Sequence, residues 1–112
     1  MLEALWSVEF GSNVGGFGAG VAVFETGRVL GGDSAFMYVG SYRTENGVVY
    51  SDIRITKYNN LSDMQSIFGP LTSFSLKVSG KADAKEMVLT GSVVEHPQLQ
   101  ITIKAVRCVE LP

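Results

Sequence analysis

Short runs of alternating apolar and polar residues constrain the fold of this chain more than any other feature of its sequence. The clearest run is "SFSLKVSGK" at 73–81, where Phe74, Leu76 and Val78 share one face and the intervening serines and lysine share the other. Because successive side chains of a strand point to opposite faces of a sheet, this period of two predicts a strand with one buried face. Helical periodicity is nearly absent, so the sequence predicts an all-β protein.

Similar runs follow one another at even spacing and are separated by Gly, Asn, Asp and Ser. We expect strands over 4–10, 19–25, 28–32, 35–43, 52–58, 73–81, 86–95 and 99–111. Eight strands are enough for an antiparallel sheet to close into a small barrel that has no exposed edge. The predicted fold is a closed, eight-stranded, antiparallel, up-and-down β-barrel of the lipocalin or calycin kind. At this length we expect one domain over 1–112.

Turn residues support this arrangement. Asn46-Gly47 and Thr26-Gly27 supply the positive φ angles that tight hairpins need. In the last run the apolar phase slips near Val106 and Cys108, which predicts a bulge. Glycines inside the strands are expected where the sheet bends or another backbone comes close; they are Gly20, Gly40, Gly80 and Gly91.

One segment, "NNLSDMQSIFGP" at 59–70, lacks the strand pattern. Asn60 or Ser62 could cap a helix there, and Gly69-Pro70 would end it. The sequence therefore predicts one short helix between two strands of the barrel.

Two glycines and an acid interrupt the strand pattern at Gly31, Gly32, Asp33 and Ser34. Glycines that expose backbone N–H groups can bind phosphate, but such loops open a helix and the residues that follow here are strand-like. We interpret the interruption as a turn in which Asp33 or Ser34 accepts bonds from backbone N–H groups. A ligand site at this turn is the alternative.

Charge and composition exclude several classes of function. The formal net charge is −2 and the basic residues form no cluster, so we expect no direct binding of nucleic acid. Glu3 stands where a secretory signal would carry basic residues, and no apolar stretch is long enough for a membrane span. Cys108 is the one cysteine, which precludes an intrachain disulfide and suits a reducing compartment. We expect a cytoplasmic protein.

Catalytic side chains are scarce. His96 is the one histidine and precedes Pro97 in an expected turn, and Cys108 is expected to pack as a small core residue. These two side chains do not make a metal site or a nucleophile with its base. We predict no enzyme activity, no metal and no cofactor.

Inward-facing aromatic residues leave one binding alternative open. Trp6, Phe36 and Tyr38 are expected on buried faces, where aromatic side chains usually just fill the core. Small barrels sometimes hold one apolar molecule instead. These three residues are the candidate lining of such a ligand site.

Several phrases carry a resemblance to a known family. They are "LWSVEFGSN", "GVAVFETGRVLGGDSAFMYVGSY", "YNN", the run Ile67-Phe68-Gly69-Pro70 and "FSLKVSG". Together they resemble the GrlR-type negative regulators of type III secretion over nearly the whole chain. Gly-Gly-Asp-Ser followed by an aromatic residue, Tyr and Gly is the most specific part.

The resemblance implies a lipocalin-like barrel that forms a homodimer and sequesters a helix-turn-helix transcriptional activator without touching DNA. Enteric members carry an acidic run in the hairpin after the Gly-Gly-Asp strand, whereas this hairpin has one base and one acid, Arg43 and Glu45. We expect partner binding first at this hairpin and next at Asp52 and Arg54. The second hypothesis is a barrel that binds a small apolar ligand.

Overall fold

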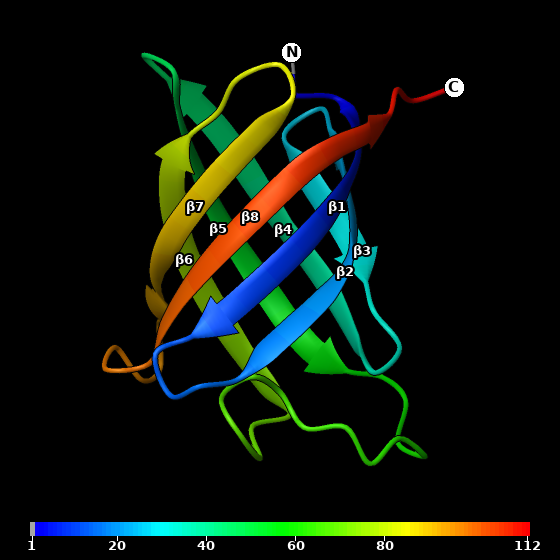
Figure 1. The fold of residues 1–112 in the computed structure, drawn as a ribbon, viewed down its shortest axis with the longest axis vertical. Helices are drawn as coiled ribbons and strands as arrows, with labels where there is room; N and C mark the ends of the chain where they lie inside the picture. The colour runs from blue at the N-terminus through cyan, green and yellow to red at the C-terminus, as the bar shows by residue number, and fades with distance from the viewer. Residues whose placement is uncertain (1) are drawn as a thin grey trace.

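A computed structural model describes residues 2–112 and shows a closed barrel of antiparallel strands (Figure 1). The strands are β1 Ala4–Ser12, β2 Phe17–Glu25, β3 Arg28–Gly32, β4 Phe36–Glu45, β5 Val48–Lys57, β6 Ser73–Lys81, β7 Glu86–Val93 and β8 Gln100–Val109. Each strand pairs with the next along the chain, and β8 pairs with β1. The predicted all-β, closed, eight-stranded antiparallel barrel is confirmed.

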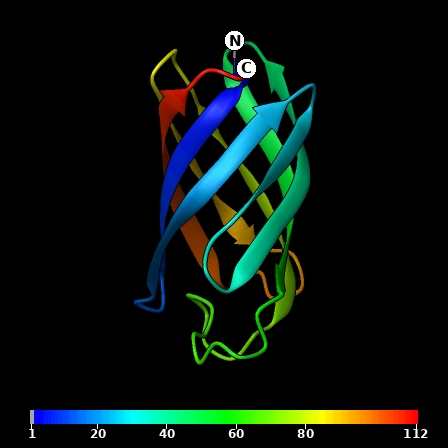
Figure 2. The same cartoon turned by 90° about the vertical axis from the view of Figure 1, so that its right-hand side faces the viewer.

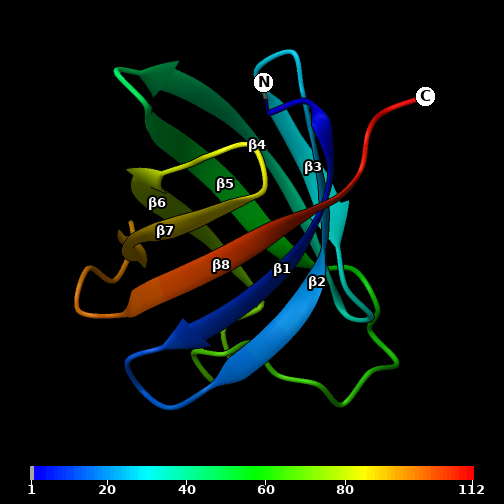
Figure 3. The same ribbon diagram turned by 45° about the horizontal axis from the view of Figure 1, so that its top comes forward.

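The pairing of β1 with β8 closes the sheet (Figure 3). Its register runs from Leu5 opposite Val109 to Ser12 opposite Ile101. Every strand of the barrel therefore has a neighbour on both sides, although β3 is short and leaves 17–20 of β2 and 42–45 of β4 without a partner in it.

The two ends of the barrel differ. Both chain termini lie at one end, which we call the terminal end, together with the turns after β2 and β4 (Figure 1). Residues 58–72 connect β5 to β6 and lie across the opposite end, which we call the loop end (Figure 2). At the terminal end, the rings of Trp6 and Tyr42 both pack against Phe24, with centroid distances of 6.0 and 5.0 Å.

The predicted hairpin turns are confirmed. Thr26 and Asn46 have φ angles of 51° and 53°, and the glycines that follow them have 77° and 80°. Two successive residues with positive φ give a tight turn whose twist matches that of the flanking strands.

The predicted bulge in β8 is also confirmed, but the phase slip from which it was predicted is not, because Val106 and Cys108 both face outward. Trp6 pairs with Arg107 and Leu5 with Val109, so Cys108 has no partner in β1. Cys108 is exposed, so the expectation that it is a core residue was wrong: inward Ala105 and Arg107 alternate with outward Val106 and Cys108.

The predicted short helix at 59–70 is wrong, because the structure has no helix anywhere in residues 2–112. Polar side chains in this segment accept hydrogen bonds from the amide two residues ahead: Asn59 from Leu61, Ser62 from Met64, and Ser66 from Phe68. Such local turns compete with helix formation, and they use the side chains that would otherwise cap a helix.

The glycines inside the strands lie where neighbouring backbone leaves no room for a side chain. A Cβ atom added to Gly80 would lie 1.8 Å from the carbonyl oxygen of Val88, and one added to Gly40 would lie 2.1 Å from that of Asp52. At these distances the backbone itself has to move, so the barrel needs glycine at both positions.

We predict that Gly80→Ala lowers the free energy of unfolding by about 2 kcal/mol or more, because the new methyl group displaces the backbone of β7. The neighbouring Ser79→Ala is the matched control and should change it by less than about 0.5 kcal/mol. Urea denaturation of the two variants measures both values. Equal stability of Gly80→Ala and wild type would contradict the close approach of β6 and β7.

Candidate functional site

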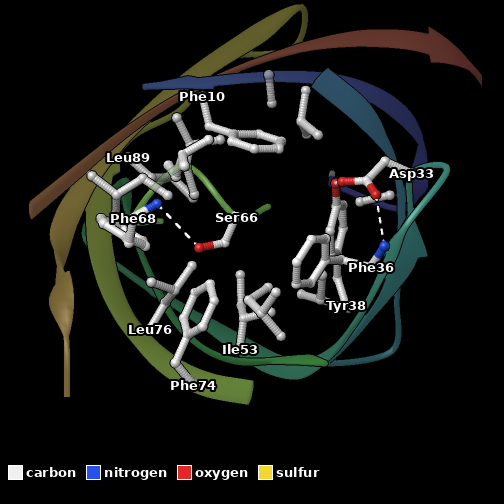
Figure 4. Close-up of a pocket in the computed structure, with 18 of the residues that line it drawn as sticks. Phe10, Asp33, Phe36, Tyr38, Ile53, Ser66, Phe68, Phe74, Leu76 and Leu89 are labelled. Atoms are coloured by element: carbon white, nitrogen blue, oxygen red, sulfur yellow. Dashed lines mark hydrogen bonds between the residues drawn. The ribbon is translucent and has the colours of Figure 1, made fainter. Parts of the chain in front are cut away.

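The interior of the barrel is hollow near the loop end. The cavity has a volume of about 80 Å³, and Figure 4 shows side chains from opposite walls pointing into it. Its lining is almost entirely apolar and comes from all eight strands and the loop at 58–72. The lining residues are Val8, Phe10, Ala22, Phe24, Val29, Asp33, Phe36, Tyr38, Ile53, Ile55, Ser66, Ile67, Phe68, Phe74, Leu76, Leu89, Ile101, Ile103 and Ala105.

The three aromatic residues expected to line a ligand site separate into two places. Phe36 and Tyr38 lie in the cavity wall. Trp6 is fully buried at the terminal end, where its Nε1 donates a hydrogen bond of 2.9 Å to the Leu2 carbonyl. Alternation placed all three inside the barrel, but alternation gives no position along the barrel axis.

The predicted turn at 31–34 is confirmed only in its second half: Gly31 and Gly32 are the last residues of β3 and pair with Ala22 and Val21, and the chain turns after them, at Asp33 and Ser34. One oxygen of the Asp33 carboxylate accepts hydrogen bonds from the amides of Ala35 and Phe36 at 2.9 and 2.7 Å. The other oxygen accepts a 2.5 Å hydrogen bond from the Tyr38 hydroxyl. A single carboxylate therefore fixes both the corner between β3 and β4 and an aromatic ring of the cavity wall.

Tyr38 stays protonated in this setting. Burial raises the pKa of its phenol, and the hydrogen bond to Asp33 raises that pKa further. The phenol thus remains a donor to the carboxylate rather than a free acid in the cavity.

The same turn holds the loop at 58–72 against the barrel. The Tyr58 hydroxyl donates to the Asp33 carbonyl at 2.7 Å, and Asn59 Nδ2 donates to the Ser34 carbonyl at 3.2 Å. On the other side of the opening, Ser12 Oγ donates to the Ile67 carbonyl at 2.7 Å. These bonds hold the apolar side chains of the loop over the cavity.

Phe68 is the buried anchor of this loop. Its ring packs edge-on against Phe74 of β6 with centroids 5.4 Å apart. Ser66 Oγ accepts a hydrogen bond from the Phe68 amide and donates one to the Gly69 carbonyl, each at 3.1 Å. The loop therefore closes the cavity with an aromatic side chain and a hydroxyl that is already bonded.

The four residues expected to bind a partner all lie on the outer face of the β4–β5 hairpin. Arg43 forms an ion pair with Glu45, and its guanidinium lies 4.4 Å from the centre of the Tyr50 ring. Asp52 and Arg54 follow on β5, opposite Ser41 and Val39 of β4. The structure brings these four residues onto one surface, which we call the hairpin border.

Charges on the hairpin border are paired within the chain. Arg54 bonds Glu95 at 2.9 Å, and the Asp52 carboxylate lies 3.9 Å from the Lys77 ammonium. The Ser75 amide, together with Arg54, holds the pKa of Glu95 below its usual value. The border therefore presents both signs of charge.

An apolar band adjoins the hairpin border. Leu5, Val23, Leu30 and Val39 are directly opposite one another across β1 to β4, and the row ends at Arg54 on β5. Val21 and Met37 lie in the next row of the same outer face. Leu30, Val39, Val21 and Met37 each leave 42–49% of their surface exposed. We call these six residues the outer apolar band.

His96 and Cys108 are far apart in the fold. His96 is exposed in the turn before β8, and Cys108 lies near the opposite end of that strand. No group of three or more His, Cys, Asp or Glu side chains in residues 2–112 is placed to hold a metal ion. Nor does the described chain contain a helix long and apolar enough to cross a membrane.

Sequence reasoning missed the residues that close the cavity: Ser12, Tyr58, Asn59, Ser66 and Phe68. The adjacent Ile67 and Phe68 in an otherwise polar stretch were the one signal that this segment has a buried anchor. Their partners lie far away in the sequence, and no local pattern identifies them.

We predict that Asp33 and Tyr38 stabilise the protein as a coupled pair. In a double-mutant cycle of Asp33→Ala and Tyr38→Phe, we expect an interaction energy of about 1–2 kcal/mol, because the bond joins a carboxylate to a partly buried donor. Tyr38→Phe combined with Ser51→Ala, which removes the distant bond to the Ser41 carbonyl, should be additive within about 0.5 kcal/mol. Additivity of the first pair, measured by denaturant unfolding, would contradict the bond.

Comparisons with known proteins support the fold. No family model matches the sequence, and no curated protein matches it. Among solved structures the chain is similar to a redesigned beta barrel at 12% identity, with a TM-score of 0.50 and coverage of 96% of this chain and 91% of that one. At this identity the likeness shows the fold alone: the chain is a closed β-barrel.

Proposed function

We propose that this protein is a non-enzymatic cytoplasmic regulator of the GrlR type, a lipocalin-like barrel that binds and sequesters a helix-turn-helix transcriptional activator. The outer apolar band beside the charged hairpin border is the observation that carries this proposal. An apolar centre with a polar, charged rim is the usual anatomy of a protein interface. The class of partner comes from the sequence resemblance.

We assign the outer apolar band to a homodimer. Contiguous exposed apolar side chains are unusual on a monomer and mark protein contacts. In a two-fold dimer the same patch meets its own copy, so an uncharged apolar band is self-complementary, whereas a patch of one charge would repel itself. Leu30 lies inside the row and Val39 ends it beside Arg54, and both are exposed enough for a second copy to bury them.

The hairpin border is the proposed contact with the activator. It projects from the terminal end of the barrel, with Arg43 and Glu45 at its tip (Figure 1). Its charges are of both signs and exposed. Such charges contribute more to the orientation of a bound partner than to the strength of binding. Binding at this border leaves DNA untouched, in keeping with the net charge of −2.

We predict that Leu30→Lys with Val39→Lys converts the dimer to a monomer, because two buried charges per subunit would remain unpaired at the interface. Sedimentation equilibrium should show at least a hundredfold weaker self-association, by an order-of-magnitude estimate of about 3 kcal/mol. The outward pair Lys104→Glu with Glu9→Lys, away from the band, is the control and should remain dimeric. A monomeric wild-type protein at micromolar concentration would refute the dimer assignment.

We predict that charge reversal at the hairpin border weakens binding of the activator. The tagged protein should retain a helix-turn-helix protein from a lysate of its host, identified by mass spectrometry. With that protein purified, the triple variant Glu45→Lys, Asp52→Lys, Arg54→Glu should bind it at least about tenfold more weakly.

A charge-matched control separates the border from net charge. The triple variant Glu9→Lys, Glu86→Lys, Lys104→Glu changes the net charge by the same amount on other outer positions and should bind like wild type. Unchanged affinity in the border variant would show that Glu45, Asp52 and Arg54 are not the contact. Failure of the wild-type protein to displace the activator from its DNA would refute sequestration.

A further inference from the structure

The cavity at the loop end has no function in the proposed regulator, whose contacts are on the outer surface. Its few polar atoms are already bonded: Asp33 to Tyr38 and to backbone amides, and Ser66 to the backbone of its own loop. No buried side-chain nitrogen or oxygen in the described residues lacks a hydrogen-bond partner. The cavity therefore offers a guest apolar contact and nothing else.

An apolar void of this kind is costly when empty. Packed interiors rarely leave space larger than a water molecule, and the groups around a void lose dispersion contacts. A void of about 80 Å³ could admit more than one water, but its walls leave no polar partner to hold water. An apolar guest would recover contacts that water cannot supply.

We propose that this cavity is a binding site for a small apolar molecule no larger than a single ring or a short alkyl chain. A cavity of about 150 Å³ lined by aliphatic and aromatic side chains is known to take benzene, and the present one is smaller. Phe10, Phe36 and Phe74 provide flat walls on different sides of the space (Figure 4). Charged or strongly polar ligands are excluded, because none of their groups would find a partner.

The loop at 58–72 is the movable wall of this site. The other walls are strands held by backbone ladders. The loop has fewer backbone bonds to the barrel, such as those from the Tyr58 and Asn59 amides to the Ala35 carbonyl, and is held also by the side-chain bonds of Ser12, Tyr58 and Asn59 and by the packing of Phe68. Segments with few backbone bonds open at a lower free energy than the sheet. The guest therefore enters and leaves past this loop.

The test uses benzene and xenon as probes of the full chain. Methyl NMR should show saturable shifts at Ile53, Leu89 and Ile103 of the wall, and none at the outward Val88 and Val106. Ala22→Leu fills the space and should weaken benzene binding at least about tenfold, while the outward Ala19→Leu should leave it within about twofold. Ile103→Phe fills the same space from β8 and replaces Ala22→Leu as the cavity-filling variant if Ala22→Leu does not fold.

Two results would overturn the proposal. One is the absence of saturable wall shifts with both probes near their solubility limits. The other is equal binding by the filled and control variants, which would place the probe elsewhere. Either result leaves partner binding at the hairpin border unaffected, so the two proposals are tested separately.

Passage of the guest beside the loop at 58–72 is tested by the rate of benzene exchange. Tyr58→Phe removes one anchor of the loop and should speed benzene exchange about threefold or more, whereas Tyr50→Phe at the terminal end should not. Line-shape analysis of the wall methyl groups gives these rates. Equal exchange in both variants would refute passage beside the loop. Binding of a long-chain fatty acid with loss of the loop's amide protection would overturn the size limit.

Discussion

Closure of the sheet between β1 and β8 is the constraint on which the rest of the structure depends. Once the first and last strands pair, every inward side chain has walls on all sides and every strand has two neighbours. Closure demands curvature, and Gly40 and Gly80 permit it because their neighbours' carbonyl oxygens occupy the space of a side chain. The same curvature leaves an interior too wide for the side chains at the loop end to fill completely.

Local chemistry explains which parts of the fold could be predicted from the sequence. Alternation gives the strands, and the pairs Thr26-Gly27 and Asn46-Gly47 give turns because their φ requirement is local. The helix prediction failed because the local residue types at 59–70 are compatible with more than one backbone conformation. Asn59, Ser62 and Ser66 are helix-capping residue types, but they close local turns equally well, and here each bonds the amide two residues ahead.

The candidate site was predictable only in part. The Asp33 turn follows from residue type, but its second role, holding Tyr58 over the opening, depends on a contact between residues 25 positions apart. The sequence could not show which of Trp6 and Tyr38 lines the cavity, since both are inward aromatic residues. Their positions along the barrel axis depend on strand tilt and register, which no short pattern encodes.

Alternation also separates the two proposed surfaces physically. Tyr38 points into the cavity and Val39, the next residue, points into the outer apolar band, so β4 contributes to both without sharing a side chain between them. A guest in the interior is surrounded by ladders that resist deformation, except where the loop at 58–72 completes the wall. The outer band and the hairpin border lie on the strands and not on that loop. A partner outside and a guest inside can therefore be bound independently, with each surface fixed by one face of the same sheet.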